Sequence, residues 1–496
     1  TAPGHGLDDY HTGLRYALEP YSPVDDDGRY VNDGKIPASL VGITALETKG
    51  RSPANEKVVE LLNEVGAIMH HERYEHSYPH CWRSKTPVIY RAMDQWFISL
   101  DENGLRNRVL DAVSTVQWMP SWGENRIRGS IEARPDWCIT RQRSWGVPMP
   151  VFYDENKEAY LDAQVIRAIA DKIETRGTDY WFASTAAELL SGIELPESWK
   201  GKTLKPGTDT IDVWMDSGSS SLAVLQRRPE LQFPADLYLE GSDQHRGWFQ
   251  SSLWIAVATT GKAPYKKVLT HGFIVDENYR KISKSADKPQ TAQSYVDRYG
   301  VDVLRLWASS ENFQDDIPIS ETILNQVTQT YRTIRNTLRF QLGNLFDFDF
   351  ERDAVSLDAL TPLDQWALSK TAELITETTE AYDQMAYHRV YQLVNRFCNV
   401  VLSAIYHDIL KDRLYVSAPQ STERRSSQTA IYLICDALVK VMAPVLSFTA
   451  DEAFAYSHQG VEYPEGISVH LQNWPQIQPA WFKSEVVAEL EELLKF

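Results

Sequence analysis

The chain has 496 residues, 43% of them hydrophobic, which is enough for two to four domains with substantial cores. Its formal net charge of −18 has the wrong sign for a general nucleic-acid binder, because phosphate contacts use Lys and Arg, so any RNA must meet local basic surfaces. No stretch approaches the roughly 20 apolar residues of a membrane-spanning helix, and no cleavable signal precedes Asp8, which argues against membrane function.

The cysteines indicate a reducing compartment, by default the cytoplasm, because they lack the spacing of a disulfide framework. They are Cys81, Cys138, Cys398 and Cys435. Cys81 and Ser84 are spaced like a Cys-x-x-Cys zinc pair, but Ser84 removes one thiolate and no second pair completes four ligands. We therefore expect no metal site, and structural roles for His76 and His80.

Residues 1–132 contain short β-like runs broken by turn signals at 25–28 and 32–34, and a helix is predicted at 55–65. The mixture is typical of a small α/β or barrel-like module. Residues 151–206 are polar and predicted to be helical, with Pro206 and Gly207 marking their end.

The next part of the chain predicts a βαβ unit. Strand signals occur at 237–239 and 268–275, with an apolar helix predicted over 249–259 between them. The turn Glu240-Gly241-Ser242-Asp243-Gln244 follows the first strand directly, where α/β sheets bind ligands. For a single Glu, the alternative is an ordinary surface charge.

A second polar motif follows the second strand and a turn at 276–278. In Lys281-Ile282-Ser283-Lys284-Ser285, two lysines alternate with hydroxyls. Mobile ammonium groups and rotatable donors on one loop can close on a polyphosphate. A solvated basic hairpin tip is the alternative for such a short motif.

From about residue 320 the sequence predicts long helices packed as a bundle. Apolar residues keep a 3.6-residue rhythm over 390–405 and again over 431–442, Pro444 interrupts the second helix, and Thr449 to Glu452 has the spacing of a capping box that starts the next. Basic residues on these helices are candidates to receive an RNA backbone, with a solvated bundle surface as the alternative. These are Arg332, Arg335, Arg339, Lys411, Arg413, Arg424 and Arg425.

Taken together, the motifs resemble class I aminoacyl-tRNA synthetases, the isoleucyl members in particular. The residues that carry the resemblance are 212–218 (DVWMDSG), 238–249 (YLEGSDQHRGWF) and 281–285 (KISKS), with 134–148 (RPDWCITRQRSWGVP) similar to the stretch where the family's chain returns to its catalytic core. The resemblance implies an α/β fold: a partial Rossmann catalytic domain, a remnant of the inserted editing domain and a C-terminal helical anticodon-binding bundle. The implied domains are 1–132 (editing), 133–325 (catalytic) and 326–496 (anticodon-binding).

The resemblance also implies an activity, the ATP-dependent ligation of isoleucine to isoleucine tRNA through isoleucyl-adenylate. Mg²⁺ is implied as the ion that accompanies ATP. The intact enzyme is also expected to hydrolyse mischarged valine in an editing reaction, and we expect it to be a monomer. In the family, a half carrying an HxGH motif precedes the point that matches residue 1. Neither this motif nor the Cys-rich zinc tail of many bacterial isoleucyl enzymes occurs within the 496 residues, so the chain alone is expected to be inactive.

Site residues transfer to this sequence by the same resemblance. Glu240, with Gly241, Asp243 and Gln244 nearby, would lie against the adenylate. Trp214 and Trp248 would form the apolar walls of the side-chain pocket, although in a chain with 15 tryptophans either can instead be core.

The loop after the second strand would hold ATP. Lys281 and Lys284 are the implied catalytic lysines, and Ile282 replaces the family's usual methionine with an apolar residue of similar volume. The implied ATP-binding residues are Lys284, His271, Gly272, Ser283 and Ser285. Asp9 matches the editing-site aspartate that anchors a free amino group.

Two alternatives remain open at the level of sequence. A valyl enzyme is disfavoured because residues 241–249 fit the isoleucyl pattern better. A tRNA-binding module without catalysis is the alternative from a different functional class.

Overall fold

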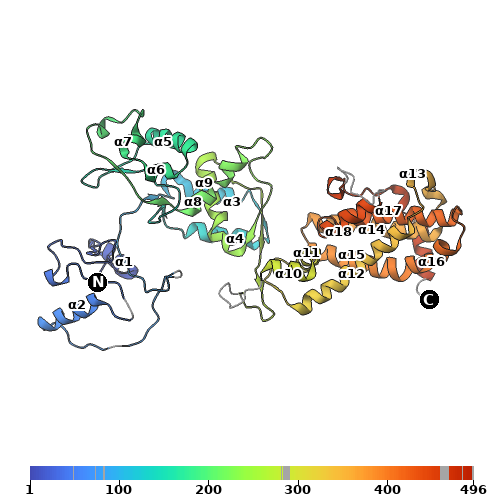
Figure 1. Cartoon of the computed structure of the whole chain (residues 1–496), viewed down its shortest axis with the longest axis horizontal. Coiled ribbons are helices and arrows are strands. Elements are labelled where there is room, and N and C mark those ends of the chain that lie inside the picture. The colour runs from blue at the N-terminus through green and yellow to red at the C-terminus, as the bar shows by residue number, and fades with distance from the viewer. Residues whose placement is uncertain are drawn as a thin grey trace. The chain divides into compact units, whose positions relative to one another are not determined.

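The computed structural model describes residues 1–47, 50–72, 74–81, 84–280, 282, 291–457, 468–482 and 484–493. The chain forms two compact units, each built from two stretches of sequence. Figure 1 labels the helices and colours the chain from the N-terminus to the C-terminus. Unit one comprises Thr1–Leu100 and Pro135–Val213, and unit two comprises Asp101–Arg134 and Trp214–Phe496. This division does not follow the predicted boundaries at 132 and 325, which rest on family resemblance and stay predictions.

The first hundred residues of unit one contain the helices α1 (Leu7–Arg15) and α2 (Pro53–Glu64). The helix predicted at 55–65 is confirmed as α2. The side chain of Ser52 accepts a hydrogen bond from the backbone N–H of Asn55 at 3.3 Å, and Pro53 occupies the first turn, where its missing N–H is no loss.

The second part of unit one packs three helices against a small antiparallel sheet. The strands are β5 (Phe152–Tyr153), β6 (Ala159–Tyr160) and β7 (Lys205–Pro206), in the order β6-β5-β7, and the helices are α5 (Ala163–Arg176), α6 (Asp179–Ala183) and α7 (Ala186–Leu190). Phe152, Trp181 and Trp199 form the centre of the core. The prediction of a helical 151–206 is therefore wrong for its two ends, because strands of two residues are too short to show a period.

Two further antiparallel pairs belong to unit one. They are β1 (Phe97–Ile98) with β3 (Trp137–Cys138), and β4 (Thr140–Arg141) with β8 (Thr210–Ile211).

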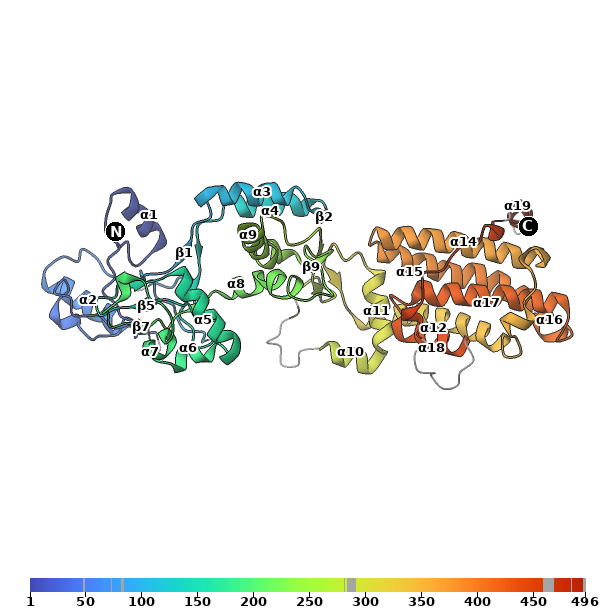
Figure 2. The same cartoon turned by 90° about the horizontal axis from the view of Figure 1, so that it is seen from above.

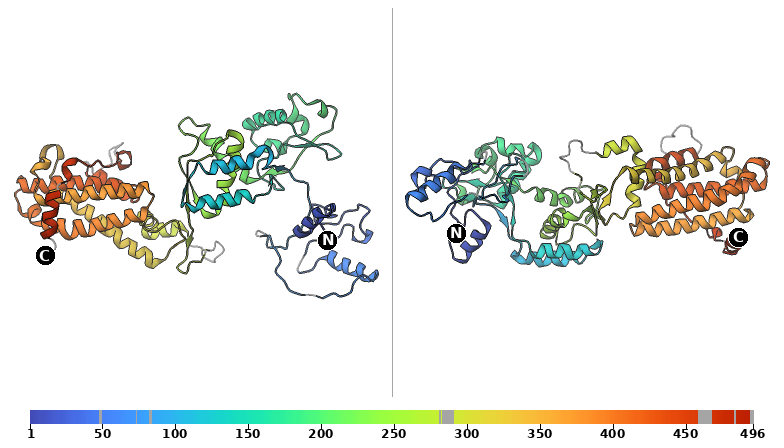
Figure 3. Two further views of the ribbon diagram at one scale, coloured as in Figure 1. Left: turned by 180° about the vertical axis from the view of Figure 1, so that it is seen from behind. Right: turned by 90° about the horizontal axis from the view of Figure 1, so that it is seen from below.

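Unit two begins with a parallel sheet of three strands, ordered β2-β10-β9. The strands are β2 (Gln117–Met119), β9 (Tyr238–Gly241) and β10 (Lys267–His271), and α9 (Trp248–Thr260) connects the last two. The predicted βαβ unit is confirmed. Helices α3 (Leu105–Val113) and α4 (Trp122–Glu132) flank β2 in sequence and lie side by side (Figure 3).

The rest of unit two is largely helical. The short helix α8 (Val213–Gly218) lies between β2 and β9 in the sequence, and after β10 the strand β11 (Ile274–Val275) pairs in parallel with β12 (Ile317–Pro318). The later helices are α10 (Ala292–Tyr299), α11 (Val301–Ser310), α12 (Glu321–Asn344), α13 (Phe350–Asp353), α14 (Pro362–Asp383), α15 (Tyr387–Arg396), α16 (His407–Val416), α17 (Thr422–Met442), α18 (Ser447–Ser457) and α19 (Ser484–Leu493).

The predicted bundle is confirmed: α12, α14, α15 and α17 run alongside one another (Figure 2). A single apolar core extends from Val303 of α11 to Trp481, and a wide π-helical segment, Phe397–Tyr406, joins α15 to α16. Within the described residues, no helix combines the length and apolarity that crossing a membrane requires.

The start of α18 differs from its prediction. The helix begins at Ser447, so Thr449 lies inside the first turn and is not the cap. The carboxylate of Asp302 on α11 accepts hydrogen bonds from the backbone N–H and the hydroxyl of Thr449, at 2.7 and 2.6 Å. The capping-box prediction is wrong because a carboxylate from another helix caps this one.

Candidate functional site

The carboxyl ends of β9 and β10 bring two of the sequence motifs to one edge of the sheet. The parallel register pairs Glu240 with Thr270 and Gly241 with His271. Side chains that follow neighbouring parallel strands converge at this edge, which is where α/β sheets bind ligands. Glu240 itself is exposed, so its carboxylate is available to a ligand.

The turn after β9 is shaped by Gln244. Its side-chain oxygen accepts a hydrogen bond from the backbone N–H of Trp248 at 2.9 Å, which caps α9, and its amide donates to Asp243 at 2.9 Å. A Cβ on Gly247 would overlap the Gln244 side-chain oxygen and lie 2.9 Å from the ring of Trp214. Only glycine permits this close approach.

The two predicted pocket tryptophans both lie near Gly247, Trp214 through its ring and Trp248 as the next residue in the chain. The ring of Trp214, from α8, packs against Gly247 and is 39% exposed. Trp248 stacks on Tyr238 with ring centroids 4.1 Å apart, and its indole N–H donates to the carbonyl of Ser217 at 2.9 Å. The structure therefore brings Trp214 and Trp248 together and fixes the orientation of the second.

The segment after β10 is hydrogen-bonded to, and in close contact with, the loop that follows α11. The N–H of Gly272 donates to the carbonyl of Phe313 at 2.8 Å, and a Cβ on Gly272 would overlap the carbonyl oxygen of Asp315. The Nδ1–H of His271 donates to the carbonyl of Gly272 at 2.7 Å. The backbone of Asp315 therefore lies directly against Gly272. The role of His271 and Gly272 in binding ATP stays a prediction.

Phe273 and His245 belong to this site although sequence reasoning missed both. The N–H of Phe273 donates to Asp316 at 2.7 Å, and a Cβ on Gly241 would lie 3.2 Å from the Phe273 ring, so this ring links the two strand ends. The only sequence signal was an aromatic residue directly after His271 and Gly272.

His245 is fully buried between Trp118, Trp122 and Phe249. Its Nδ1–H donates to the carbonyl of Ser242 at 3.1 Å, which closes the turn carrying Asp243 and Gln244. Burial lowers the pKa of this imidazole, so it stays neutral near pH 7.

The predicted phosphate loop falls largely outside the described residues. Lys281, Ser283, Lys284 and Ser285 are not among them, and Ile282 is described alone. The polar turn predicted before the loop is confirmed: the carboxylate of Asp276 accepts hydrogen bonds from the N–H groups of Asn278 and Arg280, at 2.9 and 2.8 Å.

The predicted editing residue, Asp9, lies in the first turn of α1 in unit one. The hydroxyl of Thr1 donates a hydrogen bond to its carboxylate, and this bond, with one from the N–H of Ala2, lowers the pKa of Asp9. The group is therefore an anion that already binds a donor. Within the described residues, no three His, Cys, Asp or Glu side chains are placed to hold a metal ion.

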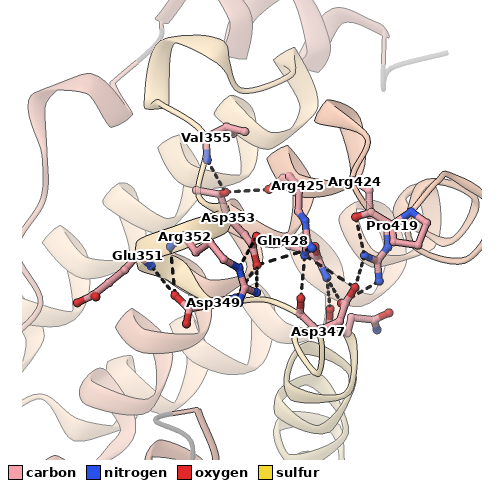
Figure 4. Close-up of polar contacts among 12 residues, drawn as sticks. Asp347, Asp349, Glu351, Arg352, Asp353, Val355, Pro419, Arg424, Arg425 and Gln428 are labelled. Atoms are coloured by element: carbon pink, nitrogen blue, oxygen red, sulfur yellow. Dashed lines mark hydrogen bonds and ion pairs between the residues drawn. The ribbon is translucent and has the colours of Figure 1, made fainter.

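The candidate RNA-binding arginines divide into exposed and buried sets. Arg332, Arg335 and Arg339 are exposed on α12, as predicted. Arg424 and Arg425 are only 7% and 6% exposed, and both pair with Asp347 (Figure 4). The prediction that these two arginines contact an RNA backbone is wrong, because their guanidinium groups form ion pairs inside the bundle.

The two basic residues of α16 also have partners. Lys411 pairs with Asp408 at 2.6 Å, and Arg413 donates to the hydroxyl of Thr361 at 2.8 Å. Among these seven candidates, and within the residues that the structure describes, only the three arginines of α12 form no ion pair with a carboxylate.

Comparison with known proteins agrees with this architecture. Residues 25–320 match the family model "tRNA synthetases class I (I, L, M and V)", and residues 364–495 match "Anticodon-binding domain of tRNA ligase". The first match covers more than half of the chain, so the chain belongs to the class I tRNA synthetases of the isoleucine, leucine, methionine and valine group, and the expected fold class is confirmed.

Within that class, the similar curated relatives are isoleucine–tRNA ligases. The one from Persephonella marina is 47% identical over 505 residues, covering 100% of this chain and 52% of the relative, and the one from Syntrophomonas wolfei is 46% identical over 497 residues with the same coverage. The chain therefore spans about half the length of the curated relatives that it matches.

Two solved structures share the fold at low identity. The ternary complex of Agrobacterium radiobacter LeuRS with tRNA and LeuAMS gives a TM-score of 0.52 at 16% identity, covering 71% of this chain and 43% of that one. Mycobacterium tuberculosis methionyl-tRNA synthetase bound by methionyl-adenylate gives 0.53 at 15% identity, covering 77% and 66%.

Proposed function

We propose that the whole protein is an isoleucine–tRNA ligase of the cytoplasm, which activates isoleucine with ATP and transfers it to isoleucine tRNA. The observation that carries the proposal is the register that places Gly241 beside His271, since it joins the two motifs on one sheet edge. Sequence identity to isoleucine–tRNA ligases along the entire chain supports the amino-acid assignment.

The amino acid would bind between the polar turn and the two tryptophans. Glu240 offers an exposed carboxylate for the substrate ammonium or a neighbouring polar group. Trp214 and Trp248 offer apolar ring surfaces that suit a branched aliphatic side chain without polar partners. Glycine at position 247 suits this arrangement because a Cβ there would lie only 2.9 Å from the Trp214 ring.

The nucleotide would be held at the neighbouring strand end. In the activation step, a carboxylate oxygen of isoleucine attacks the α-phosphorus of ATP, and the bond to pyrophosphate breaks. Lys281 and Lys284, with the hydroxyls of Ser283 and Ser285, would bind the triphosphate and the charge that moves onto pyrophosphate. Mg²⁺ would enter with ATP as part of the substrate.

Editing is the second part of the proposal. One methylene group contributes only ~1–3 kcal/mol to binding in an apolar pocket, and isoleucyl enzymes are the usual example of this limit. Binding alone therefore rejects valine too weakly, and a separate hydrolytic site is needed. Asp9 would anchor the ammonium of the mischarged residue, displacing the hydroxyl of Thr1.

Binding of tRNA is assigned to the helical bundle, with the exposed arginines of α12 contacting phosphates. We propose that the protein acts as a monomer.

The test is amino-acid-dependent exchange of pyrophosphate into ATP by the whole protein. Isoleucine should give the highest kcat/KM, and Glu240→Gln should lower it while the exposed control Glu230→Gln leaves it unchanged. Exchange that depends on valine would assign the valyl reaction instead. Tight tRNA binding without exchange for any amino acid would reduce the protein to a tRNA-binding module.

A further inference from the structure

Tyr238, the first residue of β9, lies beneath the proposed amino-acid site. Residues two apart on a strand point to the same face of a sheet, so Tyr238 and Glu240 share a face. Glu240 is exposed at the end of the strand, whereas Tyr238 is only 5% exposed. The Tyr238 side chain is therefore in the protein interior, below the residue that is proposed to meet the substrate ammonium.

The ring of Tyr238 supports the ring of Trp248. The two rings are nearly parallel, with an interplanar angle of 11° and centroids 4.1 Å apart. The indole N–H of Trp248 is bonded to the carbonyl of Ser217. A single hydrogen bond at the edge of an indole lets the ring tilt about that bond, so the stacked phenol is the contact that fixes the plane of the ring.

Tyr238 is in turn held by Tyr265, which is almost completely buried. The centroids of these two rings are 4.7 Å apart, and the hydroxyl of Tyr265 donates to the carbonyl of Phe249 at 2.9 Å. Tyr265, Tyr238 and Trp248 therefore form a connected series of three rings. The last of them is a wall of the proposed pocket, so its position depends on the two behind it.

The hydroxyl of Tyr238 is held separately from its ring. Burial raises the pKa of this phenol, and hydrogen bonding by the hydroxyls of Ser252, Ser220 and Ser221 lowers it only in part. Ser252 lies on α9, and the other two serines lie at the start of the π-helical turn Ser221–Leu225. Within the described residues, the side-chain oxygens of these serines have no other hydrogen-bond partner. Because a buried hydroxyl without a partner costs free energy, the serines favour a tyrosine at this position and hold its phenol in place.

We propose that Tyr238 is a positioning residue that determines amino-acid specificity, because it sets the depth of the pocket through the ring of Trp248. The inference rests on the proposed function, which assigns a branched aliphatic substrate to this pocket. With the Tyr238 ring stacked against it, the Trp248 ring cannot recede when a longer side chain enters. Without that support the ring can move toward the space that the phenol leaves, and the pocket becomes deeper.

A deeper pocket should accept a longer substrate. The probe is an analogue of isoleucine in which the ethyl branch is lengthened to propyl, so that it carries one extra methylene group. A methylene changes kcat/KM by about 10- to 200-fold according to whether the pocket has room for it. The measured quantity is the ratio of kcat/KM for this analogue to kcat/KM for isoleucine.

The experiment measures amino-acid-dependent exchange of pyrophosphate into ATP by the whole protein with both amino acids. Tyr238→Leu, which removes the stacked ring, should raise the ratio about tenfold. Tyr238→Phe keeps the ring and should retain the wild-type ratio. Both rates scale with the concentration of folded enzyme, so the ratio is insensitive to a loss of stability in either variant.

The matched control is Tyr432→Leu on α17. This change removes a tyrosine that stacks on Phe350 with centroids 4.6 Å apart, in the helical bundle. It should leave the ratio as in the wild type even where the melting temperature falls. A rise in the ratio for Tyr432→Leu equal to that for Tyr238→Leu would overturn the proposal.

Two further outcomes separate this inference from the proposed function. If Tyr238→Leu lowers exchange with isoleucine and with the analogue by the same factor, Tyr238 has a structural role alone and the inference fails, while the ligase activity stands. If the wild-type protein shows no exchange with isoleucine, the proposed function fails and the inference fails with it.

Discussion

The guanidinium of Arg424 holds the carboxylate of Asp347 with two hydrogen bonds, one from each terminal nitrogen, at 2.6 and 3.0 Å. Arg425 and Gln428 approach the same aspartate, Gln428 through a bond of 2.8 Å to its side chain (Figure 4). Asp347 lies between α12 and α13, so these bonds fix that connection to the start of α17. Two arginines that appear in sequence as an RNA-binding face are thus part of the bundle's interior.

Replacing Asp347 should therefore destabilise the bundle. Asp347→Ala leaves the buried guanidinium of Arg424 without its carboxylate, whereas Arg425 keeps Asp353 at 3.7 Å. Loss of one partner of a buried ion pair costs about 3 kcal/mol. The measurement is the free energy of unfolding from the urea transition of the bundle. Asp412→Asn, an exposed change on α16, is the control, and a loss for Asp347→Ala no larger than for this control would contradict the assignment.

Acid should act on the bundle first through His407. Burial against Phe340 lowers the pKa of His407 to about 4, whereas an unfolded histidine titrates near 6.5. The unfolded state therefore binds the proton first, and stability present above pH 6.5 is lost as the pH falls toward 4, by up to about 3 kcal/mol. His407→Phe should reduce the dependence of the unfolding free energy on pH between 6.5 and 4. His470→Gln, a change at an exposed position, should leave that dependence as in the wild type.

A second acid transition should follow at lower pH. The hydrogen bonds from Arg424 lower the pKa of Asp347, so its contribution is complete above the unfolded value of about 3.9 and is lost as the pH falls through the lowered folded value. Asp347→Asn should reduce the loss of stability below pH 4 without altering the window of His407. Identical acid profiles for the two proteins below pH 4 would exclude Asp347 from this transition.

Gly272→Ala should impair activation of isoleucine more than it impairs folding. The new methyl group would overlap the carbonyl of Asp315, so the backbone must move and carry His271 and Phe273 away from Gly241. A displacement of this kind costs about 10²-fold in rate when a site depends on exact positioning. The measurement is pyrophosphate exchange by the whole protein, with the melting temperature measured alongside.

The matched control is Gly129→Ala on α4, where a Cβ meets no atom within 4 Å. It should leave exchange unchanged and raise helix stability by about 1 kcal/mol. Wild-type exchange by Gly272→Ala would show that the close approach to Asp315 does not position the site.

Lys284→Ala in the whole protein should lower the single-turnover rate of adenylate formation by about 10²-fold or more, the usual effect of losing a charge contact made in the transition state. Lys262→Ala, an exposed lysine beyond α9, is the control. A rate equal to that of the control would remove Lys284 from the mechanism.

The sequence indicated which two motifs share a sheet edge because they follow adjacent strands. Gly241 and His271 are paired because a helix joins their strands into a βαβ unit, whose parallel register aligns the strand ends. The two tryptophans could be paired only through family resemblance, since nothing in their spacing shows that the ring of Trp214 packs against Gly247, the residue before Trp248.

What sequence failed to predict depends on partners distant in the chain. Arg424 and Asp347 are separated by 77 residues, and Asp302 and Thr449 by 147, so no local pattern shows that the first pair is buried or that the second caps a helix. The close approach of backbone to Gly272 could not be predicted for the same reason, because the approaching residue, Asp315, is more than forty residues away in the chain.

The order of the strands has a consequence for proteolysis. The middle strand β10 pairs with β2 on one side, yet residues 135–213 of the intervening chain belong to unit one. A single nick within those residues would sever the polypeptide without cutting any strand of the parallel sheet. The two fragments should then stay associated under native conditions and separate only in denaturant, as complementing halves of one split protein.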